Sequence, residues 1–346
     1  MILNYISIPE LNFNKSWIIG WNKIKKLNNF DKCMTLFWFI GPFIYLIERS
    51  PADIWLTLIS LIFLIRCIFT RNWKWASQLW FKLTLLLWAF GLFSALSGPD
   101  PMFSFQQGFV WIRFPLYAVA AQVWLAKDRD IRIIMLLSML ISMLIMCFIL
   151  ISEVIIEPKV RLTWPYGDVV PGGYIAKFSL PLFCILVAIA VSKNNKVGII
   201  SGLIAFLSVV VTALTGERGN FIIRACSGML AGLVWKPKIL LYFILVIIEI
   251  LAVSAILLTR PDLSSRYGKQ FLNSIPIANL SDDNPYWGAW RSGIQQGLMN
   301  PIKGIGPSGT RKTCINLDTN SPKWLPGKNY CGNHPHNFYV QLFAET

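Results

Sequence analysis

Long blocks of apolar residues, separated by short polar segments, run through most of the chain. A membrane-spanning helix needs about 20 mainly apolar residues, and several blocks reach that length. The pattern therefore predicts an all-α, polytopic membrane protein with about nine complete transmembrane helices and a partial tenth. The predicted blocks are residues 34–48, 53–70, 79–96, 109–126, 133–152, 174–191, 197–214, 219–235 and 239–258, and the tenth begins near Phe338.

The basic residues indicate on which side each loop lies. Charged residues make up 14% of the chain, against roughly 25% in soluble domains, although the net charge is +15. Lys and Arg gather in every second loop, as the positive-inside rule expects. This places the N-terminus in the cytoplasm and argues against a nucleic-acid partner. The cytoplasmic set includes Lys15, Lys23, Lys25, Lys26, Lys32, Arg71, Lys74, Lys127, Arg129, Arg132, Lys193, Lys196, Lys236 and Lys238, and the short outer loops hold Arg49, Lys159, Arg161 and Arg218.

The polar segments divide the chain into four parts. The N-terminal part is too mixed in composition for a cleaved signal peptide, and its Trp17 and Trp21 suit the membrane interface. The longest loop is rich in Pro, Gly, Asn and aromatic residues, which favours a folded loop. The parts are a cytoplasmic N-terminal segment (1–33), a transmembrane helical domain (34–258), a large outer loop with candidate motifs (259–337) and the start of a truncated transmembrane helix (338–346).

The cysteines divide by compartment. Cys314 and Cys331 lie in the large outer loop, where a disulfide can persist; we predict that bridge, with two free thiols as the alternative. A bridge there ends three residues before His334 and would steady that segment. The cysteines within or beside the apolar blocks are expected to act only in packing: Cys33, Cys67, Cys147, Cys184 and Cys226.

Both histidines of the chain, His334 and His336, lie in the run Asn333-His334-Pro335-His336-Asn337 at the outer mouth of the last block. Two imidazoles supply too few ligands for the usual metal sites, which need three or four. They are either interfacial side chains, or one of them is a general base or hydrogen-bond partner. An unperturbed pKa near 6.5 suits proton transfer at neutral pH.

A tight turn with the sequence Thr215-Gly216-Glu217-Arg218-Gly219-Asn220 is predicted at the outer surface. Gly216 and Gly219 permit unusual backbone angles and close ligand approach. Arg218 offers a planar set of donors for phosphate oxygens. Its alternative role is a membrane anchor whose charged end reaches the interface. Glu217 either orients Arg218 or lies in solvent.

Residues 286–298 show apolar and aromatic side chains at helical spacing and predict a short helix that contains Arg291. Arg291 is either a functional cation or a solvated surface charge, and the helix itself is equally explained by packing. The stretch that follows, Asn300 to Gly309, is rich in glycine and could approach a ligand, but a glycine-rich turn alone is a weak signal.

Arg113, Lys177 and Arg224 lie within apolar blocks near their predicted outer ends. Charges within spans are costly and often functional. Together with Arg218 they would form a cationic patch for a lipid pyrophosphate; individually each is explained as a snorkelling residue. The Asp128-Arg129-Asp130 run resembles the Asp-x-Asp of metal-dependent sugar transferases, but it lies on the cytoplasmic side, where ion pairing explains it better.

The combination of these motifs resembles the O-antigen ligase and polymerase superfamily, which includes bacterial pilin oligosaccharyltransferases. The resemblance rests on the Thr-Gly-Glu-Arg turn at 215–218, the Trp290-Arg291 helix with its Asn-Pro-x-x-Gly-x-Gly run, and His334-Pro335-His336-Asn337-Phe338-Tyr339 at the end of the loop. It extends in architecture from the first block to the end. Phe338 after His-Asn is atypical of the pilin branch.

The resemblance implies a glycosyltransferase in the bacterial inner membrane that acts on the periplasmic face without a metal or other cofactor. The donor would be a glycan on undecaprenyl pyrophosphate, and the acceptor lipid A–core of lipopolysaccharide. Arg218 and Arg291 match the family arginines that hold the pyrophosphate, and His336 matches the histidine proposed to activate the acceptor. His334, Asn337 and the cations of the patch would bind substrate.

Two alternative functions are compatible with the same set of transmembrane helices. A polymerase joins repeat units while they remain lipid-linked, with a second lipid-linked glycan as acceptor; a polysaccharide transporter or flippase moves them without transfer. The candidate groups gather at the outer edge rather than at the midplane typical of transporters. The family pattern also continues beyond Thr346, so we expect this chain to be a fragment or a truncated reading frame that need not be active by itself.

Overall fold

The computed structural model describes residues 13–126, 128–167, 171–177, 179, 182, 195–234, 239–270, 285–313, 334–335 and 337–346. The fold is 82% helix, and no strand occurs in these ranges, which confirms the predicted all-α class. The chain forms two compact units. The first unit contains residues 1–55 and 121–268, and the second contains residues 56–120 and 269–346.

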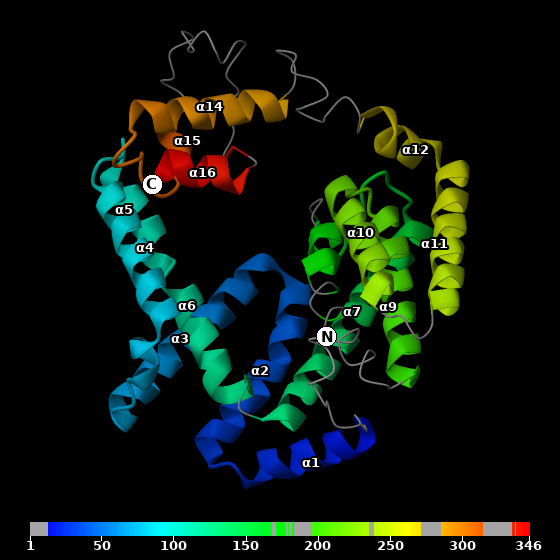
Figure 1. Cartoon of the computed structure of the whole chain (residues 1–346), viewed down its shortest axis with the longest axis horizontal. Coiled ribbons are helices and arrows are strands. Elements are labelled where there is room, and N and C mark those ends of the chain that lie inside the picture. The colour runs from blue at the N-terminus through cyan, green and yellow to red at the C-terminus, as the bar shows by residue number, and fades with distance from the viewer. Residues whose placement is uncertain are drawn as a thin grey trace. The chain divides into compact units, whose positions relative to one another are not determined.

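The first unit is built around α7, its longest described helix, with 28 residues. Helix α1 packs against the start of α7 and against α2, while α9 packs against α7, α10 and α11 (Figure 1). The short α12 follows α11 directly. The helices are α1 (Phe13–Lys26), α2 (Asn29–Ile47), α7 (Arg129–Ile156), α9 (Asn195–Leu214), α10 (Arg218–Val234), α11 (Ile239–Thr259) and α12 (Pro261–Tyr267), with a π-helical turn at Gln122–Ala126 before α7.

The core of the first unit joins α7 to the segment that follows it and to α9. Met146 and Leu150 of α7 are buried with Leu162, which lies beyond the end of α7, and with Val211, near the end of α9. Burial of side chains of this size stabilises a fold by about 1.5–3 kcal/mol each. The core therefore fixes the last turns of α7 and α9 beside each other, at the end of the unit where α10 begins.

The second unit pairs α4 with α5 and α14 with α16 (Figure 1). The indole Nε1 of Trp88 on α4 donates a hydrogen bond of 2.9 Å to the carbonyl of Gly108 on α5. Helix α3 (Arg49–Thr70) begins in the first unit and continues in the second. The other elements are a 3₁₀ turn (Lys74–Ser77), α4 (Leu79–Ala95), α5 (Pro101–Val110), α6 (Arg113–Ala121), α14 (Pro285–Met299), α15 (Thr310–Thr313) and α16 (Phe338–Glu345).

Three described helical segments are long and apolar enough to cross a membrane: Ser50–Thr70, Pro101–Ala126 and Arg129–Ile156. Shorter apolar helices cover Leu79–Ala95, Gly202–Leu214 and Val246–Thr259. Several helices turn large apolar side chains outward, such as Leu86, Phe148 and Leu258 at 68%, 72% and 83% exposure. Such surfaces suit lipid, while the count of nine to ten spans stays a prediction.

The predicted block 109–126 differs from the observed elements. Its apolar run belongs to two helices, α5 and α6, which meet at Trp111–Ile112, and it ends in the π-helical turn. Pro115 has no backbone N–H to give to the turn before it, which explains why the helix is interrupted just ahead of α6. The block 174–191 lies largely outside the described residues; residues 171–177 are helical.

Candidate functional site

The turn between α9 and α10 holds Arg218 at the first position of α10. Gly216 adopts a φ of +72°, and a Cβ on it would lie 2.3 Å from the carbonyl oxygen of Val160. Only glycine fits both conditions, because other residues rarely adopt this φ and here would also clash. Thr215 donates a 2.7 Å hydrogen bond to the carbonyl of Thr212. The predicted tight turn is confirmed.

Two further arginines reach this turn from other parts of the first unit. Arg161 forms an ion pair with Glu217 through Nη2 and Oε1. Arg266 of α12 donates from Nε to the carbonyl of Gly216 at 2.6 Å. Sequence reasoning had counted Arg161 only as a loop charge and had not considered Arg266. Glu217 therefore pairs with Arg161, which differs from both roles predicted for it, namely orienting Arg218 and lying in solvent.

A buried carboxylate fixes the segment that carries Arg161. Glu153, near the end of α7, is 0% exposed. Its carboxylate accepts hydrogen bonds from the backbone N–H of Thr163 at 2.9 Å and 3.0 Å, from the Thr163 hydroxyl at 2.9 Å, and from the Trp164 N–H at 2.8 Å. Hydrogen bonds to a charged group are worth about 1.5–3 kcal/mol each, so Glu153 sets the path of the loop.

Helix α12 ties the same loop to the turn. Arg260, just before α12, donates to the carbonyl of Lys159 at 2.9 Å and forms an ion pair with Asp262 at 2.7 Å. At the other end of α12 the Tyr267 hydroxyl donates to the carbonyl of Ala213 at 2.8 Å. This short helix thus connects two segments that lie far apart in the sequence.

The other predicted cations of the first unit are placed differently. Arg224 is 0% exposed and lies between α10 and α9, where its Nε and Nη2 donate to the Ser208 hydroxyl at 3.0 Å and 2.5 Å. Lys177 is exposed, with its ammonium 5.8 Å from the centre of the Tyr174 ring. Their role in a cationic patch stays a prediction.

Arg113 belongs to the second unit, at the start of α6. Its Nη1 donates to the Thr57 hydroxyl at 3.3 Å, and its guanidinium lies 5.2 Å from the centre of the Phe114 ring. Its backbone carbonyl accepts a 2.9 Å hydrogen bond from Ser60. These contacts join α6 to α3. The predicted role of Arg113 in substrate binding stays a prediction.

Arg291 also lies in the second unit, on α14, which confirms the helix predicted over 286–298. Its side chain is 0% exposed, so the alternative of a solvated surface charge is wrong. Two glycines on α14 allow α16 to approach closely: a Cβ on Gly293 would lie 2.6 Å from Val340, and one on Gly297 would lie 2.4 Å from Phe343. The arginine helix and the helix after the histidine run therefore pack directly.

The histidine run ends at the start of α16. Asn337 caps this helix, because its side-chain oxygen accepts hydrogen bonds from the N–H groups of Tyr339 at 3.0 Å and Val340 at 3.2 Å. Such a cap stabilises a helix by about 1 kcal/mol. His334 is exposed, while His336 and the predicted Cys314–Cys331 disulfide lie outside the described residues. The predicted start of the last block near Phe338 is confirmed.

The glycine-rich stretch after α14 is held by α4 and α16. Gly304 and Gly306 have φ values of +63° and +81°. The Ser94 hydroxyl of α4 donates to the carbonyls of Lys303 and Glu345 and accepts from the N–H of Gly306 at 3.2 Å. The two glycines therefore let the backbone turn where it is hydrogen-bonded to α4, next to the end of α16.

The second unit also contains a cavity of about 440 Å³ with mainly apolar walls. Its lining includes Trp88, Trp111, Phe114, Pro307, Phe338 and Leu342.

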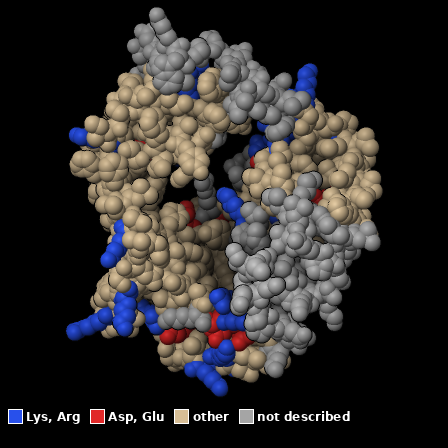
Figure 2. Space-filling model, viewed as in Figure 1, with Lys and Arg blue, Asp and Glu red and all other residues tan. Residues whose placement is uncertain are grey.

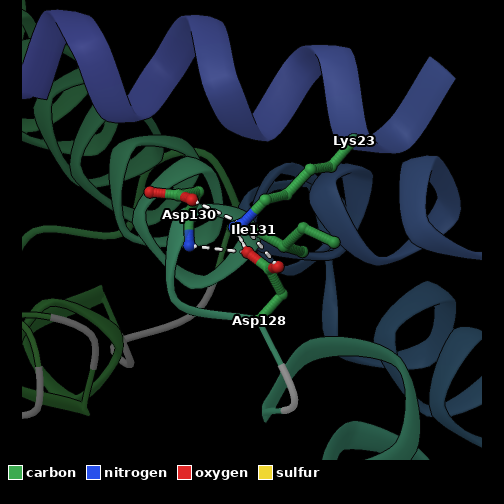
Figure 3. A network of polar contacts seen from close by, with 4 residues as sticks. All are labelled: Lys23, Asp128, Asp130 and Ile131. Carbon is green, nitrogen blue, oxygen red and sulfur yellow. Dashed lines mark hydrogen bonds and ion pairs between the residues drawn. The ribbon is translucent and has the colours of Figure 1, made fainter. Parts of the chain in front are cut away.

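The Asp128-Arg129-Asp130 run is confirmed as an ion-pairing element. Lys23 of α1 extends between the two carboxylates, at 2.8 Å from Asp128 Oδ2 and 2.7 Å from Asp130 Oδ2 (Figure 3). Asp128 also caps α7, because its Oδ1 accepts from the N–H groups of Asp130 and Ile131. Acidic and basic side chains gather along this edge of the unit around α1 (Figure 2). In the described ranges no group of three or more His, Cys, Asp or Glu side chains could hold a metal ion.

The three long apolar helices and the apolar side chains on their outer faces indicate a helical membrane protein. Residues 203–346 match the family model described as O-Antigen ligase, a span that includes Arg218, Arg291 and both histidines. This part of the chain is thus similar to the O-antigen ligase family, a likeness that points to a glycosyltransferase-like ligase or polymerase. No curated protein and no solved structure matches the chain.

Proposed function

We propose that the protein is a ligase that moves an O-antigen glycan from undecaprenyl pyrophosphate to lipid A–core on the periplasmic face of the inner membrane. The observation that carries the proposal is the family match over residues 203–346, which contains every residue proposed to do the chemistry. The position of Arg218 at the start of α10 supports it, because a helix N-terminus and a guanidinium both favour a bound phosphate.

In the proposed reaction a hydroxyl of the acceptor sugar attacks the anomeric carbon of the donor glycan. The bond between that carbon and the pyrophosphate oxygen breaks, and undecaprenyl pyrophosphate leaves with the bonding electrons. His336 accepts the hydroxyl proton, which suits an imidazole at neutral pH. Arg218 and Arg291 stabilise the charge that develops on the leaving diphosphate, so that no metal is required.

The test is reconstitution of the protein in liposomes with purified lipid-linked donor and with either lipid A–core or a second lipid-linked glycan as acceptor. We expect glycan transfer to lipid A–core that persists in EDTA. Arg218→Gln should lower the rate roughly 100-fold, in the range seen when one transition-state donor is lost. Lys269→Gln, an exposed residue just after α12, is the matched control.

The products separate the proposed reaction from the alternatives. Elongation of a lipid-linked glycan without modification of lipid A–core would identify a polymerase instead. In cells, His336→Ala should let the lipid-linked donor accumulate at the periplasmic face, because the donor still arrives but is not consumed. Accumulation at the cytoplasmic face would contradict a transferase and favour a flippase.

A further inference from the structure

Three arginines of the first unit surround the start of α10. Arg218 is its first residue, Arg266 is bonded to the preceding Gly216, and Arg161 is paired with the adjacent Glu217. Burial, followed by repulsion from Arg161 and Arg218, lowers the pKa of Arg266. The three positive charges therefore lie close enough to destabilise one another, a cost that a bound anion would remove.

The acidic side chains beside this cluster do not neutralise it. Glu157 pairs with Lys159, Glu217 with Arg161, and Asp262 with Arg260. Within the described part of the chain, neither Arg218 nor Arg266 forms an ion pair with a carboxylate. Among the described residues, Arg218 and Arg266 are thus left without an ion-pair partner at the start of α10, and Glu217 offsets their positive charge only in part.

The start of α10 is also open to a ligand. Gly219, the second residue of the helix, is exposed, and apart from its chain neighbours and its own helix no described residue has an atom within 4 Å of the place where its Cβ would be. Arg161 and Glu217 retain 35% and 22% side-chain exposure, so the cluster is half-buried yet reachable. The first N–H groups of a helix have no partner within the helix and point toward an approaching anion.

We propose that Arg161, Arg218 and Arg266 form one anion site that binds a phosphate or diphosphate group against the first turn of α10. Under the proposed function, on which the identity of the ligand rests, this group is the diphosphate of the lipid-linked donor. Arg161 and Arg266 are then substrate-binding residues in addition to Arg218. Arg161 lies outside the residues that match the family model.

The hydrogen bonds leave suitable donors for such a group. Arg266 uses Nε for the carbonyl of Gly216, and its two terminal nitrogens have no hydrogen-bond partner among the described residues. This bond fixes the plane of the guanidinium, and a fixed planar set of donors matches phosphate oxygens better than an ammonium does. Glu217 holds Arg161 beside the turn rather than occupying the position of the anion.

The experiment measures binding separately from transfer. The purified chain in nanodiscs is titrated with inorganic pyrophosphate, and in a second arm with nanodiscs that contain undecaprenyl pyrophosphate. We expect Arg266→Gln and Arg161→Gln each to raise the Kd about tenfold, the effect of one lost charged hydrogen bond. Arg266→Lys, which keeps the charge but loses the planar donors, should recover part of the affinity. Lys269→Gln should change the Kd less than twofold.

Each outcome decides the inference without depending on catalysis. Weakened binding in both arms supports the site with a lipid diphosphate as its ligand. If the arginine variants bind inorganic pyrophosphate more weakly but bind undecaprenyl pyrophosphate as the parent does, the three arginines form an anion site whose ligand is not the lipid-linked donor. Unchanged Kd values in both arms, for variants that keep the unfolding temperature of the parent, overturn the inference. Wild-type protein that binds pyrophosphate but transfers no glycan would contradict the proposed function and leave the site intact.

Discussion

The two ends of α7 use opposite charges in contrasting ways. At its start, one lysine of α1 lies between two aspartates, so that each charge has a partner. At its other end, roughly 40 Å away for a helix of 28 residues, three arginines lie near one glutamate, which forms an ion pair with only one of them. At the start of α7, where the lysine and both aspartates are paired, the network joins elements of the fold, whereas the end with cations unpaired among the described residues is poised for a ligand. The resemblance of Asp128-Arg129-Asp130 to a sugar-transferase motif was therefore a weaker guide than its ion pairs.

The largest expected effect on stability comes from substitution of Glu153, whose hydrogen bonds hold the loop that carries Arg161. Glu153→Leu removes the buried acceptor of two partly buried backbone N–H groups and a hydroxyl. Since an unsatisfied group costs about 1–3 kcal/mol when buried, we take the low end for these three groups and expect a loss of about 3 kcal/mol in the free energy of unfolding. Chemical unfolding in detergent measures it. Glu157→Gln, on an exposed side chain four residues later, should cost less than about 0.5 kcal/mol, and equal losses would contradict the assigned role of Glu153.

The next effect concerns the backbone of the turn. Gly216→Ala places a side chain at a φ of +72° and 2.3 Å from a carbonyl oxygen, which should cost about 2 kcal/mol or more. The matched control is Gly219→Ala, three residues away, where nothing lies within 4 Å of the added Cβ. This change should be neutral or stabilise the helix slightly. Thermal unfolding of both variants distinguishes them, and similar midpoints would show that the turn is not constrained.

A smaller effect is expected at α12. Arg260→Ala removes the hydrogen bond to the carbonyl of Lys159 and the ion pair with Asp262, for a loss of about 1 kcal/mol. Ser265→Ala, an exposed position in the same helix, serves as the control. If the two variants are cleaved at α12 by a protease at the same rate, the connection between α12 and the loop after α7 does not stabilise this region.

The smallest effect is expected at the start of α7. The Lys23–Asp128 pair is partly exposed, with 43% and 28% side-chain exposure, so a double-mutant cycle of Lys23→Ala and Asp128→Asn should give a coupling of about 0.5 kcal/mol at neutral pH. Glycan transfer in these variants should equal that of the parent. A coupling above about 2 kcal/mol, or loss of transfer, would remove the distinction between the two ends.

The pH dependence of this coupling follows from Asp128. Burial alone would raise the pKa of Asp128, but the hydrogen bonds from Lys23 and from two backbone N–H groups outweigh it and lower the pKa below its ordinary value of 3.8. The stabilisation is therefore complete above pH 3.8 and disappears as the pH falls through the lowered pKa. Repeating the cycle at a pH below the lowered pKa of Asp128 should give a coupling near zero.

The sequence predicted the elements better than their contacts. The Arg291 helix, the Arg218 turn and the start of α16 were predicted because apolar periodicity and turn residues are local signals. Arg161 and Arg266 were missed, because their position depends on how two loops return to the start of α10. One signal was present: Glu153 stands at the edge of an apolar block, and an acid in such a place requires buried partners.

The brevity of α12 has a consequence for how occupancy of the anion site can be observed. A helix of seven residues has no stability by itself in water, so its order depends on Arg260, Arg266 and the buried Leu263. A ligand that binds Arg266 would bind only the docked helix and shift the equilibrium toward it. Amide protons of residues 261–267 should then exchange with deuterium more slowly when the site is filled, which makes this helix a built-in reporter of donor binding.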